Sequence, residues 1–140
     1  MSVSVRFMAL SDAHYFVTHV SSRPRTLSAH ERRNRFMRAV IFLSWVGLEA
    51  AVVDELHRLR NMGHGGKLPK RRLRDRVAFL LQAKDQPCDQ AAFDRLRRVR
   101  NELAHPSGFG APAPDSAVAT ETFEYCLGII RAFYPYHIHF

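Results

Sequence analysis

One segment limits the possible folds of this chain more than any other, the stretch from Ser28 to Asn61. It begins with a Ser28-x-x-Glu31 capping box, which is a typical helix start, and it ends before a glycine-rich turn that opens at Gly63. Apolar residues cover most of the circumference of this predicted helix: Phe36, Val40, Ile41, Leu43, Trp45, Val46, Leu48, Val52 and Val53. Such a helix needs neighbours on more than one side, and the sequence leaves open whether a second copy of the chain is one of them.

The remaining blocks predict that the whole chain is helical. Further helices are expected over 11–20, 69–83 and 91–104, and a last one from Ser116 or Thr120 to Pro135. Asp89 is the expected N-cap of the helix over 91–104. The last helix has an inner side of large apolar residues: Phe123, Leu127, Ile130 and Phe133. Strand signals are weak, because no stretch alternates between apolar and polar residues.

Length and composition predict one cytoplasmic domain over residues 1–140. The chain is 46% apolar and 24% charged, which is sufficient for a packed core. Residues 39–53 are the single candidate for a membrane span, but this run is short for a span and contains Glu49, so a core helix is the favoured interpretation. Cys88 and Cys126 are too few for a disulfide framework and are expected to be reduced thiols.

The charge of the chain points to an anionic partner. Twenty-one Lys and Arg residues face 13 Asp and Glu residues, a net charge of +8. Nucleic acid is the commonest partner of so basic a domain, although a generally basic protein with no such partner would show the same balance. The candidate contacts to nucleic acid lie on two of the predicted helices: Lys70, Arg71, Arg72, Arg97 and Arg98.

The most informative motif for function is Arg100-Asn101-x-x-x-His105, followed by Pro106. On a helical wheel Arg100 falls within the apolar face of its helix, where a charge is costly unless something pairs with it. One interpretation is a structural ion pair with Glu49 or Asp54 on the long helix. The other is a functional site, and the neighbouring Asn101 and His105 favour it.

The three residue types of the motif suit work on a phosphodiester. A guanidinium at Arg100 can hold two phosphate oxygens and stabilise developing charge. The imidazole of His105 can move protons near neutral pH, and Asn101 can orient the phosphate or the imidazole. Pro106 disfavours helical geometry at His105, so the helix is expected to end there and allow the imidazole to turn towards Arg100.

The motif and the order of the helices resemble the HEPN superfamily over about residues 28–134. The resemblance implies an all-α fold, an up-and-down four-helix bundle preceded by a short extra N-terminal helix. It also implies a homodimer in which two motif helices build one composite cleft, and a metal-independent endoribonuclease with Arg100, His105 and Asn101 at its catalytic centre. No metal or cofactor is implied. RNA is the implied substrate, and the product would carry a 2′,3′-cyclic phosphate.

Many members of that superfamily are toxins of toxin–antitoxin pairs or of phage-defence systems, so an antitoxin protein is a further expected partner. In one subgroup a Tyr modified by the partner stands two residues after the motif His, but here Ser107 occupies that position, which argues against this regulation. Other members bind nucleotide, RNA or a protein without catalysis, and that remains the alternative, together with a plain helical scaffold. The C-terminal tail holds His137 and His139, which lack a visible third metal ligand.

Overall fold

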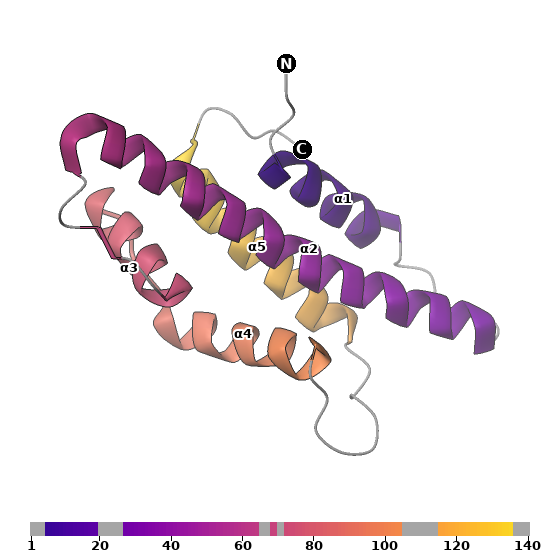
Figure 1. Cartoon of the computed structure of the whole chain (residues 1–140). Coiled ribbons are helices and arrows are strands. Elements are labelled where there is room, and N and C mark those ends of the chain that lie inside the picture. The colour runs from indigo at the N-terminus through magenta and orange to yellow at the C-terminus, as the bar shows by residue number, and fades with distance from the viewer. Residues whose placement is uncertain (1–4, 20–26, 65–67, 70–71, 105–114, 136–140) are drawn as a thin grey trace.

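The computed structural model describes residues 5–19, 27–64, 68–69, 72–104 and 115–135 of the chain. This part is helical and contains no strand, which confirms the prediction of an all-α fold. The elements are α1 (Val5–His19), α2 (Leu27–Leu59) with a kinked turn at Arg60–His64, α3 (Leu73–Ala83), α4 (Gln90–Ala104) and α5 (Ser116–Phe133) (Figure 1).

The helix ends agree with the sequence where a side chain caps the helix. Asp89 accepts a hydrogen bond from the Ala92 amide at 3.0 Å and starts α4, as predicted. Asp115 does the same for the Val118 amide at 2.7 Å, so α5 begins at Ser116 rather than at Thr120.

Two predicted starts are wrong. α1 begins at Val5 instead of Ser11, and α3 begins at Leu73 instead of Pro69. Arg72 precedes α3 with extended backbone (φ −91°, ψ 132°), which delays the helix beyond the proline.

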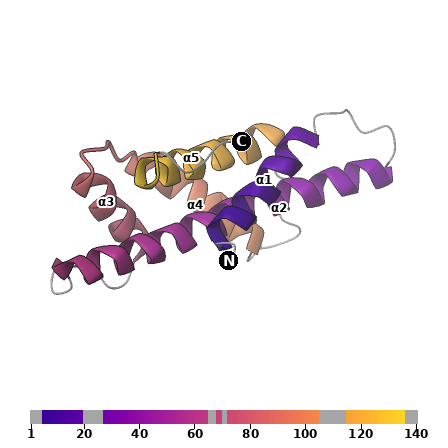
Figure 2. The same cartoon turned by 90° about the horizontal axis from the view of Figure 1, so that it is seen from above.

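The long helix α2 is the centre of the core and extends along the whole molecule (Figure 1, Figure 2). α1 and α5 pack along it, and α3 and α4 lie on its other side. α1 and α4 run opposite to α2, whereas α5 runs parallel to it, as the contacts Arg33 to Ser116 and Tyr125 to Asp89 require. The large buried hydrophobic side chains of α2 are Met37, Val40, Ile41, Trp45, Leu48, Val52 and Leu56.

α2 is the one helix of the described chain that is long and apolar enough to cross a membrane by length and composition, and half of its most apolar window is buried inside the molecule. The core helix of a soluble protein passes the same test, and α1 and α5 pack along α2. Both cysteines are free thiols, with Cys126 buried.

A buried carboxylate joins the C-terminal part of α2 to the end of α3. Glu55 is fully buried, and its Oε1 accepts hydrogen bonds from Arg58 Nη2 at 2.6 Å and from Lys84 Nζ at 3.0 Å. Burial on its own raises the pKa of the Glu55 carboxyl, but the hydrogen bonds and charges of Arg58 and Lys84 outweigh it, so the pKa lies below its ordinary value of 4.5.

We therefore expect Glu55 to stabilise the fold in a pH-dependent way. Because its pKa is lowered by folding, the contribution is complete above pH 4.5 and is lost as the pH falls through the lower folded-state value. Glu55→Gln should lower the free energy of unfolding by about 2 kcal/mol at neutral pH, and this difference should shrink as the pH falls. Urea unfolding of both proteins between pH 7 and pH 3 measures it. Glu121→Gln, which removes an exposed pair with Arg95, is the control and should have little effect at any pH.

Candidate functional site

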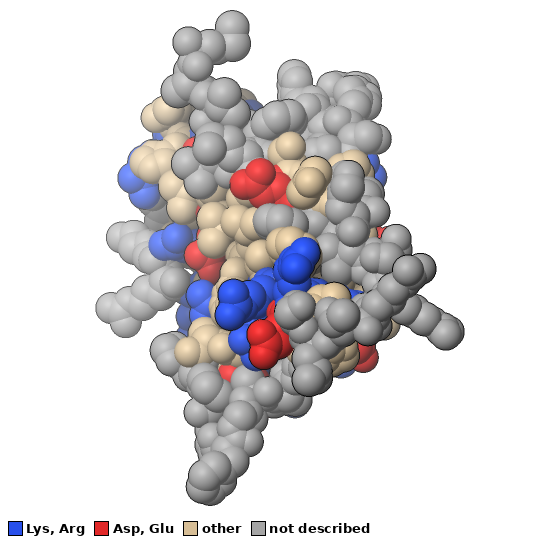
Figure 3. Space-filling model, turned by 90° about the vertical axis from the view of Figure 1, so that its right-hand side faces the viewer, with Lys and Arg blue, Asp and Glu red and all other residues tan. Residues whose placement is uncertain are grey.

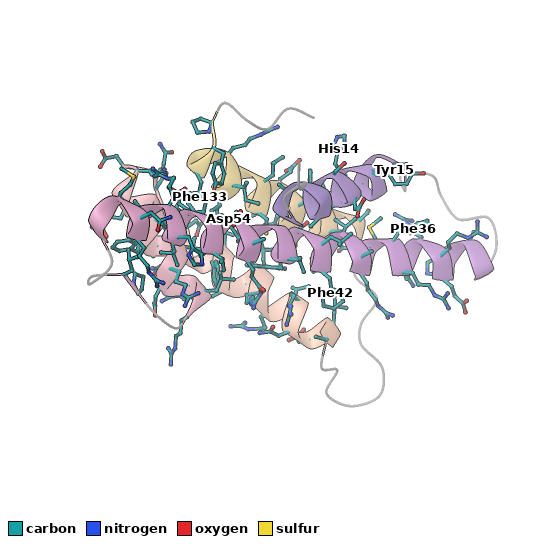
Figure 4. The ribbon with its side chains drawn as sticks, turned by 45° about the horizontal axis from the view of Figure 1, so that its top comes forward. His14, Tyr15, Phe36, Phe42, Asp54 and Phe133 are labelled. Atoms are coloured by element: carbon teal, nitrogen blue, oxygen red, sulfur yellow. The ribbon has the colours of Figure 1, made fainter. Side chains whose placement is uncertain are left out.

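The predicted site lies on α4, and its position is fixed by packing against α2. Phe93 meets Trp45 edge to face, with ring centroids 5.2 Å apart. One turn later Arg97 lies over the Trp45 ring with its Cζ 4.9 Å from the centroid, and Arg100 lies over Phe42 at 5.7 Å. Higher numbers on α4 thus meet lower numbers on α2, so the end of α4 lies towards the start of α2. Figure 4 shows Phe42 on the side of α2 that faces the last turns of α4.

Arg97 is held in a structural arrangement. Its Nη1 donates to Glu49 Oε1 at 2.9 Å while its guanidinium covers Trp45. Three quarters of its side chain is withdrawn from solvent, since 25% remains exposed. Arg97 was predicted to contact nucleic acid, but in the structure its charge is already matched by Glu49.

The ion pair proposed for Arg100 on sequence grounds is wrong. Glu49 is bound to Arg97, and Asp54 lies about 18 Å farther along α2 than Phe42, twelve residues at the helical rise (Figure 4). Within the described chain no carboxylate lies within ion-pair distance of Arg100.

Arg100 instead has a guanidinium with unused donors. Its Nε is buried and makes no hydrogen bond within the described chain, and its Nη1 donates to Asn101 Oδ1 at 3.2 Å. A buried donor without a partner is costly, as is a charge that no counter-charge matches. Within the described residues, the burial of this donor is therefore not compensated by a protein acceptor or by a counter-charge.

The outer side of the same stretch of α4 forms a shallow open depression. Its lining combines four charged or amide side chains with the two arginines already described: Asp94, Arg97, Arg98, Arg100, Asn101 and Glu102. Arg98 and Asn101 are exposed there, so both are accessible to a ligand that reaches Arg100.

Several predicted site residues are not near Arg100 or fall outside the description. His105 lies outside the described residues, as do Ser107, Lys70, Arg71 and the tail with His137 and His139. Arg72 is exposed at the start of α3. Arg74, in the first turn of that helix, bonds Asp94 and Gln90, which are about 9 to 15 Å along α4 from Arg100. The basic start of α3 is thus near the beginning of α4, away from the motif.

Sequence reasoning missed one residue of this region, Arg38. Its Nε is also buried without a hydrogen-bond partner in the described chain. Arg38 precedes Phe42 by one helical turn, and residues at this spacing share a face. The spacing 38, 42, 45 and 49 puts Arg38 on the same face of α2 as Trp45 and Glu49, but the sequence alone does not show that this face meets α4.

Arginines gather at this end of the molecule. Figure 3 views the end where α2 begins and α4 finishes, and Lys and Arg side chains lie together in the middle of that face. Among the described residues, the first part of α2 carries Arg32, Arg33, Arg35 and Arg38, and the second half of α4 carries Arg97, Arg98 and Arg100. Such a surface attracts polyanions.

Among the described residues, no group of three or more His, Cys, Asp or Glu side chains is placed to hold a metal ion. Comparisons of the chain with models of protein families, with curated proteins and with solved structures found no match.

Proposed function

We propose that this chain is a metal-independent endoribonuclease of HEPN type, acting in the cytoplasm as the toxin of a toxin–antitoxin or phage-defence system. The observation that carries the proposal is the state of Arg100. It lies at the end of α4 against Phe42, and within the described residues its buried Nε has no hydrogen-bond partner and its guanidinium has no carboxylate beside it. A structural arginine at such a position would have a counter-charge, as Arg97 has in Glu49.

The proposed roles follow from the chemistry of RNA cleavage without a metal. Arg100 holds the non-bridging phosphate oxygens and stabilises the charge that develops on them. His105, next in sequence to the last residue of α4, moves the proton of the 2′-hydroxyl or of the leaving oxygen. Asn101, already bonded to Arg100 Nη1, fixes the direction of the guanidinium and leaves its amide nitrogen free to orient the phosphate.

We propose further that the catalytic unit is a homodimer of up-and-down helical bundles, with a cleft shared by two copies of α4. The alternating directions of α2, α4 and α5 support the bundle, and α1 is the extra N-terminal helix (Figure 1). An apolar stripe on α2 beside α4 supports the dimer, since Val46 is 42% and Val53 44% exposed and both align with the half-buried Phe42. Exposed apolar rows of this kind mark protein interfaces.

The experiment that tests the function is cleavage of labelled RNA by the purified protein in EDTA. We expect cleavage to proceed without a divalent metal and to leave 2′,3′-cyclic phosphate ends, because the nucleophile is the adjacent 2′-hydroxyl. DNA of the same sequence lacks this hydroxyl and should stay intact, which makes it the matched control. RNA that binds in a salt-dependent way but is never cut would overturn the enzyme and support the non-catalytic alternative.

A further inference from the structure

Arg38 occupies a defined place relative to the motif helix. With Phe42 as origin, Arg38, Trp45 and Glu49 all fall within about 60° on the wheel of α2. Trp45 and Glu49 both contact α4, so Arg38 lies in the stripe that faces α4.

The register of the two helices places Arg38 near the point where the motif leaves α4. The helices are antiparallel, and Arg100 lies level with Phe42. Moving one turn towards the start of α2 reaches Arg38, and moving the same distance of about 6 Å along α4 reaches Ala104. Ala104 is the last residue of α4 and directly precedes His105. Arg38 therefore belongs at the level of Ala104, the residue at which α4 ends.

The two arginines share an unusual condition. The Nε of Arg38 and the Nε of Arg100 are both buried and make no hydrogen bond within the described chain. No carboxylate in that part of the chain forms an ion pair with either of them, because Glu49 is used by Arg97. Arg100 lies over Phe42, and Arg38 precedes Phe42 by one turn on the same face of α2, so the two like charges repel each other, and neither Nε is satisfied within the described chain. An anion between them would remove both costs.

We propose that Arg38 and Arg100 together form a phosphate-binding site, in which Arg38 holds the backbone of the nucleic acid and Arg100 acts on the phosphate that reacts. The assignment of the phosphate to RNA rests on the function proposed above, whereas the site itself requires only a phosphate. Arg38 comes from a different helix than the motif, so the site needs the packing of α4 on α2 to exist. Guanidinium groups suit this use because their planar donors match phosphate oxygens.

The first test uses inorganic phosphate and the arginine side-chain Nε–Hε signals of ¹⁵N-labelled protein. We expect the signals of Arg38 and Arg100 to shift together and to saturate, whereas that of the exposed Arg35 does not shift. Assignment comes from Arg38→Lys and Arg100→Lys. Shifts of Arg100 without Arg38, or no saturable shift of either, would overturn the shared site.

The second test uses RNA and two variants that each remove one positive charge from the same helix. Arg38→Met keeps the aliphatic packing of the side chain and removes the guanidinium. We expect it to weaken RNA binding by about tenfold to a hundredfold and to reduce the slope of log affinity against log salt by about 1. It should raise KM more than it lowers kcat. Arg35→Ala, the matched control, should weaken binding far less because Arg35 is exposed.

The outcomes separate this inference from the proposed function. If RNA is cleaved and Arg38→Met behaves like Arg35→Ala, the function stands and the role of Arg38 is wrong. If phosphate shifts both arginine signals but RNA is neither bound nor cleaved, the phosphate site stands and the ribonuclease is wrong. Circular dichroism of Arg38→Met identifies a folded variant, and Arg38→Lys repeats the RNA test with the charge retained but the planar donors lost.

Discussion

Arg100→Ala should lower the kcat for RNA cleavage by about 10²- to 10³-fold, the usual effect of removing one donor from the charge that develops in a transition state. The buried Nε of Arg100 has no partner in the described chain, so its removal breaks no ion pair of the resting protein. The fold should therefore tolerate the change better than the activity does. Single-turnover cleavage of labelled RNA in EDTA, with circular dichroism of each variant, separates the two effects.

Three further variants make this result specific. Arg95→Ala removes an exposed positive charge of the same helix that is already paired with Glu121, and it should affect cleavage only slightly. Arg100→Lys retains the charge without the planar donors and should recover only a small part of the activity. His105→Ala should match the loss of Arg100→Ala if both act on one phosphate. Equal activity of wild type and Arg100→Ala would rule out the proposed centre.

Trp45→Ala should lower the free energy of unfolding by about 3 to 5 kcal/mol, the largest stability effect expected of any single change here. Trp45 is 1% exposed, and its ring meets Phe93 edge to face and carries the guanidinium of Arg97. The deletion leaves a cavity between α2 and α4 and removes both contacts. A domain of this size has only about 5 to 15 kcal/mol of stability, so the variant is expected to be close to unfolding. Chemical denaturation followed by circular dichroism measures the change.

The controls for this prediction lie beside Trp45. Trp45→Phe keeps an aromatic ring in the core and should cost clearly less than Trp45→Ala. Val46→Ala, at an exposed position of the same helix, should cost little. A small effect of Trp45→Ala would mean that α4 does not depend on this contact for its position, and the placement of Arg100 over Phe42 would lose its physical basis.

One signal, the period of the apolar residues, predicted both the helices and the position of Arg100. The wheel of α4 put Arg100 within the apolar face, and the structure buries its Nε. The helical wheel could not show which side chain of α4 would reach Glu49. Arg97 lies at the edge of that face, but its long side chain crosses Trp45 and takes the carboxylate. The direction in which a side chain points on a helical wheel therefore does not establish which residues that side chain contacts.

Arg38 could not be chosen from the sequence because it is one of four arginines at the start of α2. Their identical charges distinguish none of them, and only the register of α4 on α2 shows which one faces the motif. The predicted start of α3 was wrong for a related reason. Pro69 is a suitable first residue of a helix, but Arg72 takes an extended conformation, so the helix begins after it. Both features depend on tertiary packing, which propensities do not contain.

The contact between Arg97 and Trp45 also provides an optical reporter. Trp45 is the single tryptophan of the chain, and a guanidinium from the motif helix lies 4.9 Å from the centre of its ring. Indole emission responds to the position of a nearby charge. Any ligand that shifts α4 will therefore change the intrinsic fluorescence of the unlabelled protein. The emitting residue, Trp45, lies about one helical turn along α2 from Phe42, the residue that Arg100 covers. Binding at this site can thus be followed by the natural chromophore, without a label that would disturb the basic surface.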